Sequence, residues 1–304
     1  MNPPKLPEVA ATEDQARLTR LKYLWRIAVS VWTTAVDKHL GLIAAGVAFF
    51  GLFGIFPGIA AVIAIFGLMA DPNIVAEQLL LMEDIIPTDA YELLTAQVNR
   101  LVLAPAGTLG WATVLSITVA IWSCRMGVGA LIGGLNAIAG QRMRSGLKHI
   151  VVAFTLTIVL VALAIVALTV VVVVPVALAF FPVAYATAWI LEVLRWVIAL
   201  GVLIIALSLL YRFGPARIGG RGRWLTVGAV SVVILWIGAS LGLQYYLTNF
   251  NSYNEVYGSI GAVIGMLLWL YVSAYLILLG AALNVAVHTY DHPEDTPKDE
   301  PFIE

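Results

Sequence analysis

The sequence predicts an all-α fold: a polytopic membrane protein with six transmembrane helices and additional amphipathic helices at the membrane interface. Hydrophobic residues make up 61% of the chain and charged residues only 12%, whereas soluble domains carry roughly a quarter charged residues. Six apolar segments are long enough to cross a bilayer, which takes about 20 residues. Basic residues collect in every second connection between these segments. The predicted spans are residues 40–70, 107–140, 150–180, 189–211, 224–247 and 257–287.

The chain opens with a predicted cytoplasmic tail and an amphipathic helix, together residues 1–38. Thr12 and Gln15 form a capping box at the start of this helix, after a loose tail over residues 1–11. Cations alternate there with large apolar residues: Arg17, Arg20, Lys22 and Arg26 with Leu18, Leu21, Trp25 and Trp32. Such a composition is typical of a helix that lies among lipid headgroups. A positive flank to the first span is the alternative, and both interpretations put this end in the cytoplasm.

Two segments outside the spans have a different composition. Residues 71–106 carry acids among leucines and isoleucines and are divided by Pro87, so we expect two short amphipathic helices that cap the outer face. Glu83 and Asp84 point in different directions on a helix and have no histidine nearby, so they do not indicate a metal site. Residues 290–304 are acidic and carry prolines, which predicts a disordered cytoplasmic tail.

The first two spans contain the most informative polar and helix-breaking residues. Pro57 removes a backbone donor inside the first span, so we expect a kink there that acts as a hinge. In the second span an arginine, an asparagine and a pair of glycines share one stripe about 80° wide: Thr118, Arg125, Gly129, Gly133 and Asn136. An arginine in the membrane costs about 2.5–3.5 kcal/mol on insertion scales, so Arg125 is expected to face protein or water. The alternative is that its long side chain reaches the headgroups.

The later spans supply the remaining candidates. Glu192 and Arg195 are three residues apart and are expected to pair near the outer surface. In the fifth span Gly238, Gly242, Tyr245 and Asn249 lie on one side. The last span carries its small and polar residues on one face about 140° wide: Gly258, Gly261, Gly265, Ser273, Gly280 and Asn284. We expect these faces to pack against other helices, because association inside lipid depends on close approach and hydrogen bonds.

Several segments carry a resemblance to a known family. They are YGSIGAVIGMLLWLYVSAYLILLGAALN in the last span, NFNSYNEVYGS before it, LYRFGP at 210–215, AAGVAFFGLFGIFPG at 44–58 and WSCRMGVGALIGGLNAIAG at 122–140. Together they resemble the YihY/virulence factor BrkB family of bacterial inner-membrane proteins. The resemblance implies a transporter-like build and links to export and to resistance to killing, and the family long carried a ribonuclease label. Many members read GAELN where this chain has Ala282, so any role of that glutamate is absent here.

These observations support a transporter-like interpretation and leave one alternative open. With both termini in the cytoplasm, the inward stripes enclose a pathway for an anionic or amphipathic, lipid-like substrate. Its candidate contacts are Arg125, Asn136, Thr118, Ser273, Asn284, Asn249 and Tyr245. The alternative is a membrane scaffold or partner-binding protein whose small-residue faces serve helix association, with a homo-oligomer as one form.

The sequence predicts few other partners. Membrane lipids are expected to bind, with anionic headgroups at the cytoplasmic loops. No nucleic acid, cofactor or metal is expected. We expect no enzymatic activity, because the cytoplasmic loops lack the carboxylates and histidines that RNA hydrolysis requires. The single cysteine, Cys124, excludes an intramolecular disulfide.

Overall fold

The computed structural model describes residues 6–69, 106–173, 185–216, 225–249 and 259–291. Within these ranges every regular element is a helix, and six helices are long and apolar enough to cross a membrane, which confirms the predicted fold class. They are α2 (Leu40–Met69), α5 (Ala106–Ile138), α6 (Gly146–Leu168), α8 (Tyr185–Phe213), α9 (Val227–Asn249) and α11 (Ser259–Asp291). A π-helical turn, η1 (Thr169–Val173), continues α6. The predicted outer cap over 71–105, Gly258 and the tail beyond Asp291 lie outside the described residues.

A further helix, α1 (Leu6–Asp37), precedes the six spans and begins earlier than predicted. The loose tail expected over residues 1–11 is therefore helical from Leu6, and the Thr12–Gln15 pair lies inside the helix rather than at its start. Pro7 is compatible with this start. Amide hydrogens in the first turn of a helix have no acceptor within the helix, so a residue without one is tolerated there. His39, in the left-handed conformation with φ of 51°, ends α1 and redirects the chain into α2.

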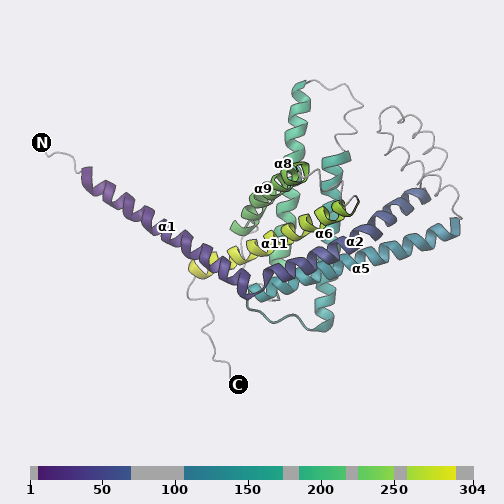
Figure 1. Cartoon of the computed structure of the whole chain (residues 1–304), viewed down its shortest axis with the longest axis horizontal. Coiled ribbons are helices and arrows are strands. Elements are labelled where there is room, and N and C mark those ends of the chain that lie inside the picture. The colour runs from purple at the N-terminus through teal and green to yellow at the C-terminus, as the bar shows by residue number, and fades with distance from the viewer. Residues whose placement is uncertain (1–5, 70–105, 174–184, 217–224, 250–258, 292–304) are drawn as a thin grey trace, which may run out of the picture.

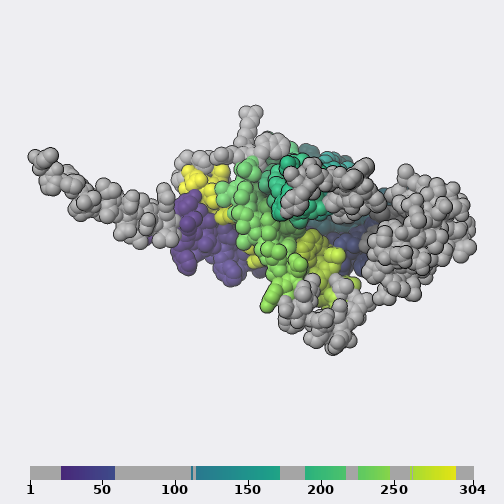
Figure 2. Space-filling model, turned by 90° about the horizontal axis from the view of Figure 1, so that it is seen from above, coloured from purple at the N-terminus to yellow at the C-terminus, as the bar shows by residue number. Residues whose placement is uncertain are grey.

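The arrangement centres on α11, which packs against α1, α2, α5 and α9. Helices α2 and α5 run side by side along their length, and α6 connects α5 to α8 (Figure 1). Helix α1 extends away from the other helices, and only its C-terminal half lies against them (Figure 1). In Figure 2 the end of α11, in yellow, lies beside α1, in purple, at the edge of the molecule.

The largest apolar core lies where α2, α5 and α11 meet. Leu40, Leu135 and Leu278 are buried there among alanines of α2 and α11. Gly134 of α5 makes this contact close: an added Cβ would lie 2.7 Å from Leu278 Cδ2 and 3.1 Å from Ile43 Cγ2. Close packing around glycine is how helices associate in lipid. The chain continues through Pro57 without a break in α2.

One end of the bundle holds a set of buried and half-buried polar contacts. We call it the polar end and define it by Asn136, Arg144, Thr226 and Asn284, which lie where α5, α8 and α11 end and α9 begins. Helix α5 stops there at Gly140, whose φ of 63° and amide bond to Ala137 O, with the Gln141 amide bonded to Asn136 O, form a Schellman motif. Because these helix ends lie together, successive spans alternate in direction.

Few residues of the spans are fully buried in the described part of the chain. The buried share is 17–22% of the residues in the apolar part of each span. Gly238 and Gly242, which we expected to pack against a helix, are exposed, and no described atom lies within 4 Å of a Cβ added at either. Helix α9 turns its opposite face, with Ala229, Val232 and Val233, toward its described neighbours, so packing at these two glycines stays a prediction.

Candidate functional site

Arg125 is the cation that lies deepest in the spans. It stands near the middle of the apolar segment Val114–Ile138 of α5. Its guanidinium carbon lies 4.4 Å from the centre of the Trp122 ring, one turn earlier on the same helix. Stacking of this kind is favourable, because the negative face of the indole ring attracts the cation. It provides partial compensation for a charge in an apolar environment.

Among the described residues, the Arg125 guanidinium lacks the partners that usually accompany a charge in a membrane. Its Nε atom is buried without a hydrogen-bond acceptor. In the described part of the chain no carboxylate forms an ion pair with it, and Trp122 is 57% exposed. An intramembrane cation generally faces a partner or a water-filled cavity. The Arg125 side chain therefore has an unsatisfied donor beside an exposed tryptophan of the same helix.

A second nitrogen-bearing side chain lies on the same side of α5. Gly129 is one helical turn after Arg125, and a Cβ added there would lie 3.7 Å from His149 Nε2 of α6. His149 Nδ1 is buried without a partner. Gly133, one turn further, faces Met143 in the connection before α6. His149 directly precedes the third predicted span, 150–180, and its approach to Gly129 depends on how α5 and α6 pack.

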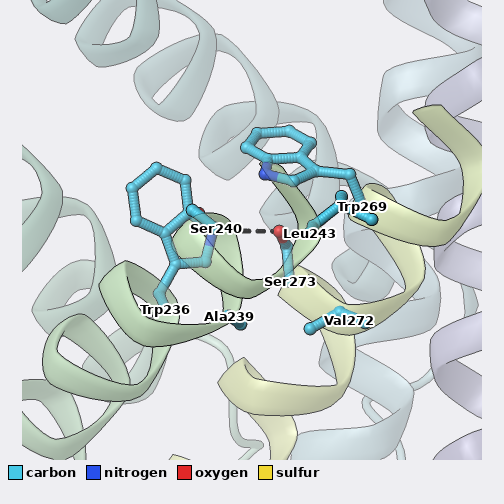
Figure 3. Close-up of a pocket in the computed structure, with 7 residues that line it drawn as sticks. All are labelled: Trp236, Ala239, Ser240, Leu243, Trp269, Val272 and Ser273. Atoms are coloured by element: carbon cyan, nitrogen blue, oxygen red, sulfur yellow. Dashed lines mark hydrogen bonds between the residues drawn. The ribbon is translucent and has the colours of Figure 1, made fainter. Parts of the chain in front are cut away.

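A small pocket lies between α9 and α11. Trp236 Nε1 donates to Ser273 Oγ at 3.0 Å, and the Trp236 and Trp269 rings meet edge to face with centres 5.7 Å apart (Figure 3). Ser240 Oγ is buried there without a partner. The pocket has a volume of about 20 Å³, which is room for about one water molecule. Ser273, a predicted pathway residue, is therefore engaged by an indole beside this pocket.

Two further pathway candidates form hydrogen bonds with other groups of the same chain. Asn136 is 1% exposed, its Nδ2 donates to Ile132 O at 2.9 Å, and its Oδ1 accepts from the Ala216 amide at 2.6 Å. Asn284 Oδ1 accepts from the Gly228 amide at 2.7 Å, and its Nδ2 donates to Thr226 Oγ1 at 3.1 Å. These contacts connect α5 to the end of α8, and α11 to the start of α9.

The remaining candidates lie on α5, α9 and α11. Thr118 is exposed and donates to Val114 O at 2.7 Å. Tyr245 is exposed near the end of α9, and Asn249 is its last helical residue. Gly261 and Gly265 are half-buried in α11.

The Glu192–Arg195 pair forms an ion pair within α8. Trp196 Nε1 also donates to Glu192 Oε1 at 3.0 Å, and Arg195 Nη1 donates to Val171 O at 3.4 Å. Nearly half of the Glu192 side chain is exposed, so the pair adds little to stability. Across the described ranges, no three His, Cys, Asp or Glu side chains gather as metal ligands.

The fold and the site together define a multi-pass integral membrane protein with an arginine inside its spans. Residues 31–302 match the family Virulence factor BrkB, and the chain belongs to this family. The resemblance inferred from the last span and from the LYRFGP segment is thereby confirmed.

Individual relatives match over shorter stretches. The chain is 28% identical over 169 residues to the putative ribonuclease-like protein YfkH of Bacillus subtilis, covering 54% of this chain and 61% of the relative. It is 37% identical over 81 residues to a UPF0761 membrane protein of Xanthomonas axonopodis pv. citri, and 38% identical over 81 residues to one of Xanthomonas oryzae pv. oryzae. These matches cover 27% of this chain and 19% of each Xanthomonas relative. No solved structure matches the chain.

Proposed function

We propose that this protein is a transporter or exporter of the bacterial inner membrane, with both termini in the cytoplasm, for an anionic or amphipathic, lipid-like substrate. The observation that carries the proposal is the Arg125 guanidinium. It lies mid-span, stacked on Trp122, with a buried Nε and no carboxylate partner among the described residues.

The chemistry around Arg125 supports an amphipathic anion. A guanidinium binds carboxylate or phosphate through paired hydrogen bonds, and a carboxylate or phosphate head would supply the missing acceptors. Trp111, Leu115 and Trp122 are exposed on the same helix and offer an apolar surface for a hydrocarbon tail. His149, near Gly129, places a second nitrogen within reach of the same α5 surface. In this proposal Pro57 is the hinge of α2.

A scaffold function is the second candidate, and the polar end favours it. Asn136 and Asn284, two pathway candidates, have both ends of their amides occupied by hydrogen bonds within the chain. The pocket beside Ser273 is small. A scaffold needs such interlocked helices and no route through them. Homo-oligomer formation through the uncovered span surface belongs to this second candidate.

The proposal assigns no hydrolytic activity to the chain. The ribonuclease-like name belongs to the Bacillus relative, which is 28% identical over part of the chain. Hydrolysis of RNA needs carboxylates or histidines gathered around the scissile phosphate. The described connection between α5 and α6 carries Arg142 and Arg144 but no carboxylate.

Transport in proteoliposomes tests the choice between transporter and scaffold. Efflux of a fluorescent phospholipid and of an anionic amphiphile is measured for the native protein, for Arg125→Leu and for Arg125→Lys. We expect Arg125→Leu to lower the rate about tenfold or more, because hydrogen bonds to charged groups contribute roughly 1.5–3 kcal/mol. Arg125→Lys keeps the charge but not the forked geometry, so it should retain part of the rate.

Arg142→Leu is the matched control, since Arg142 is exposed in the connection between α5 and α6. It removes one positive charge outside the spans and should leave efflux unchanged. Thermal melting of each reconstituted variant separates loss of transport from loss of fold. If Arg125→Leu folds and transports at the native rate, Arg125 does not bind substrate. If the native protein moves neither probe, the scaffold function is favoured.

A further inference from the structure

Helix α1 has two apolar faces, and the bundle covers only one of them. Ile27 and Ala35 are each 6% exposed and, with Val31, lie against the helices that α1 contacts. A second stripe consists of Trp25, Val29, Trp32 and Val36, all exposed, with the two indoles at 72% and 69%. At about 100° per residue this stripe spans about 60° and is centred about 130° from the buried one.

Two attachments of α1 place this stripe at the level where the spanning helices α2 and α11 begin and end. At one end, Asp37 is separated from Leu40, the first residue of the membrane-spanning α2, by only Lys38 and His39. At the other, Tyr23 Oη donates to Asp291 Oδ1 at 3.0 Å, and the Tyr23 and Tyr290 rings meet edge to face. Asp291 is the last residue of α11. The segment from Tyr23 to Asp37 is therefore attached at both ends to the ends of spanning helices.

The residues around the stripe match a lipid surface in charge and type. Lys22 and Arg26 are exposed on α1 and flank the stripe on one side. Tryptophans concentrate at the boundary between hydrocarbon and headgroups, where one side of the ring is apolar and the N–H is hydrated. Cations beside such a stripe attract anionic headgroups.

We infer that the Trp25–Val29–Trp32–Val36 stripe inserts into the anionic leaflet next to the polar end of the bundle. Helix α1 is then held between protein and lipid, with Ile27, Val31 and Ala35 on the bundle and the stripe among the acyl chains. This inference does not depend on transport. A scaffold would use the same anchor.

A pair of adjacent positions tests which face of α1 enters lipid. Val36 and Asp37 are both exposed and lie about 100° apart on the helix. In a Cys124→Ala chain, Val36→Cys or Asp37→Cys is labelled with bimane and placed in nanodiscs containing phosphatidylglycerol with brominated acyl chains. We expect quenching at position 36 to exceed that at position 37 several-fold, and the difference to shrink when phosphatidylcholine replaces phosphatidylglycerol.

Two results would overturn the inference. Equal, weak quenching at both positions would place the stripe in water or against another protein. Dipolar broadening between nitroxides at position 36, lost on dilution with unlabelled chain, would instead place a second copy on the stripe. If the Cys124→Ala chain does not fold, the native chain is compared with Trp25→Phe/Trp32→Phe. The difference emission spectrum should be blue-shifted and quenched by bromolipid, and a red-shifted, unquenched spectrum contradicts insertion.

Discussion

Gly280 shows how a single residue without a side chain sets the distance between two helices. An added Cβ there would lie 2.5 Å from Tyr211 Oη and 3.0 Å from Gly228 O, and would also meet Val232 Cγ2. Tyr211 Oη donates to Ile277 O at 2.8 Å across the same contact. The backbones of α9 and α11 therefore cross where only glycine fits. One turn away, Asn284 accepts a hydrogen bond from the Gly228 amide and donates one to Thr226.

Replacing Gly280 by alanine should weaken this crossing. We expect Gly280→Ala to destabilise the protein by about 1–3 kcal/mol, because an added methyl group must push apart backbone and a bonded tyrosine. Gly238→Ala is the matched control on α9, where no described atom lies within 4 Å of the new Cβ. Melting in detergent, followed by circular dichroism, should show a lower transition temperature for Gly280→Ala alone. Equal effects of both substitutions would show that the crossing is not close.

At the scale of elements, the end of α8 depends on Arg144, a side chain in the connection between α5 and α6. Arg144 donates from Nη1 to Gly214 O at 2.7 Å and from Nη2 to the carbonyl oxygens of Phe213 and Pro215. The last carbonyls of a helix have no partner within it and carry partial negative charge, so a guanidinium stabilises them. Gly214 is close-packed there, with an added Cβ 2.6 Å from Leu135 Cδ1.

Removal of Arg144 should loosen the polar end. We expect Arg144→Gln to cost about 1.5–3 kcal/mol, the usual range for hydrogen bonds from a charged donor. Arg142→Gln, in the same connection but exposed, should cost little. Hydrogen exchange at residues 210–216 measures the effect locally, and faster exchange only in Arg144→Gln is the expected result. Unchanged exchange would mean that α8 ends stably without the guanidinium.

The attachment of α1 to α11 should depend on pH. The hydrogen bond to Asp291 raises the pKa of Tyr23 above its ordinary value of 10.0, with smaller contributions from burial and from the Asp291 charge. Because the pKa in the folded protein is the higher one, the contact is fully present below pH 10 and is lost as pH rises through the raised pKa. Difference titration at 295 nm between the native protein and Tyr23→Phe should show one phenol ionising late. Asp291→Asn should return that phenol toward pH 10. A Tyr23 that titrates normally in the native protein would contradict this contact.

At the scale of the whole molecule, few residues of the six spans are fully buried among the described helices. Only 17–22% of the residues in the apolar part of each span are buried, and many large apolar side chains are exposed. The covered part is concentrated around α11 and at the polar end, where the YihY/BrkB-like segments meet. Two of these segments meet at two contacts. Asn136 accepts a hydrogen bond from the Ala216 amide just after LYRFGP, and a Cβ added at Gly214 would lie against Leu135 of α5. Four of the five segments that carry the family resemblance therefore contribute to the largest core, and most of the fifth, at 249–259, lies outside the described residues.

The sequence by itself determined the spans, their alternation and the family. A continuous apolar run that is long enough crosses a bilayer as a helix, which satisfies its own backbone hydrogen bonds, and the motifs lie mostly within such runs. It also singled out Arg125, Asn136, Gly280 and Asn284 by their type and position. Only the tertiary structure decided what each contacts: Trp122 for Arg125, the α8 end for Asn136, the α9 start for Asn284, and no described residue for Gly238. The reason is that helical periodicity defines which residues share a face, while the partner of that face depends on how the helices pack. In lipid that choice rests on a few close contacts and hydrogen bonds between residues far apart in the chain.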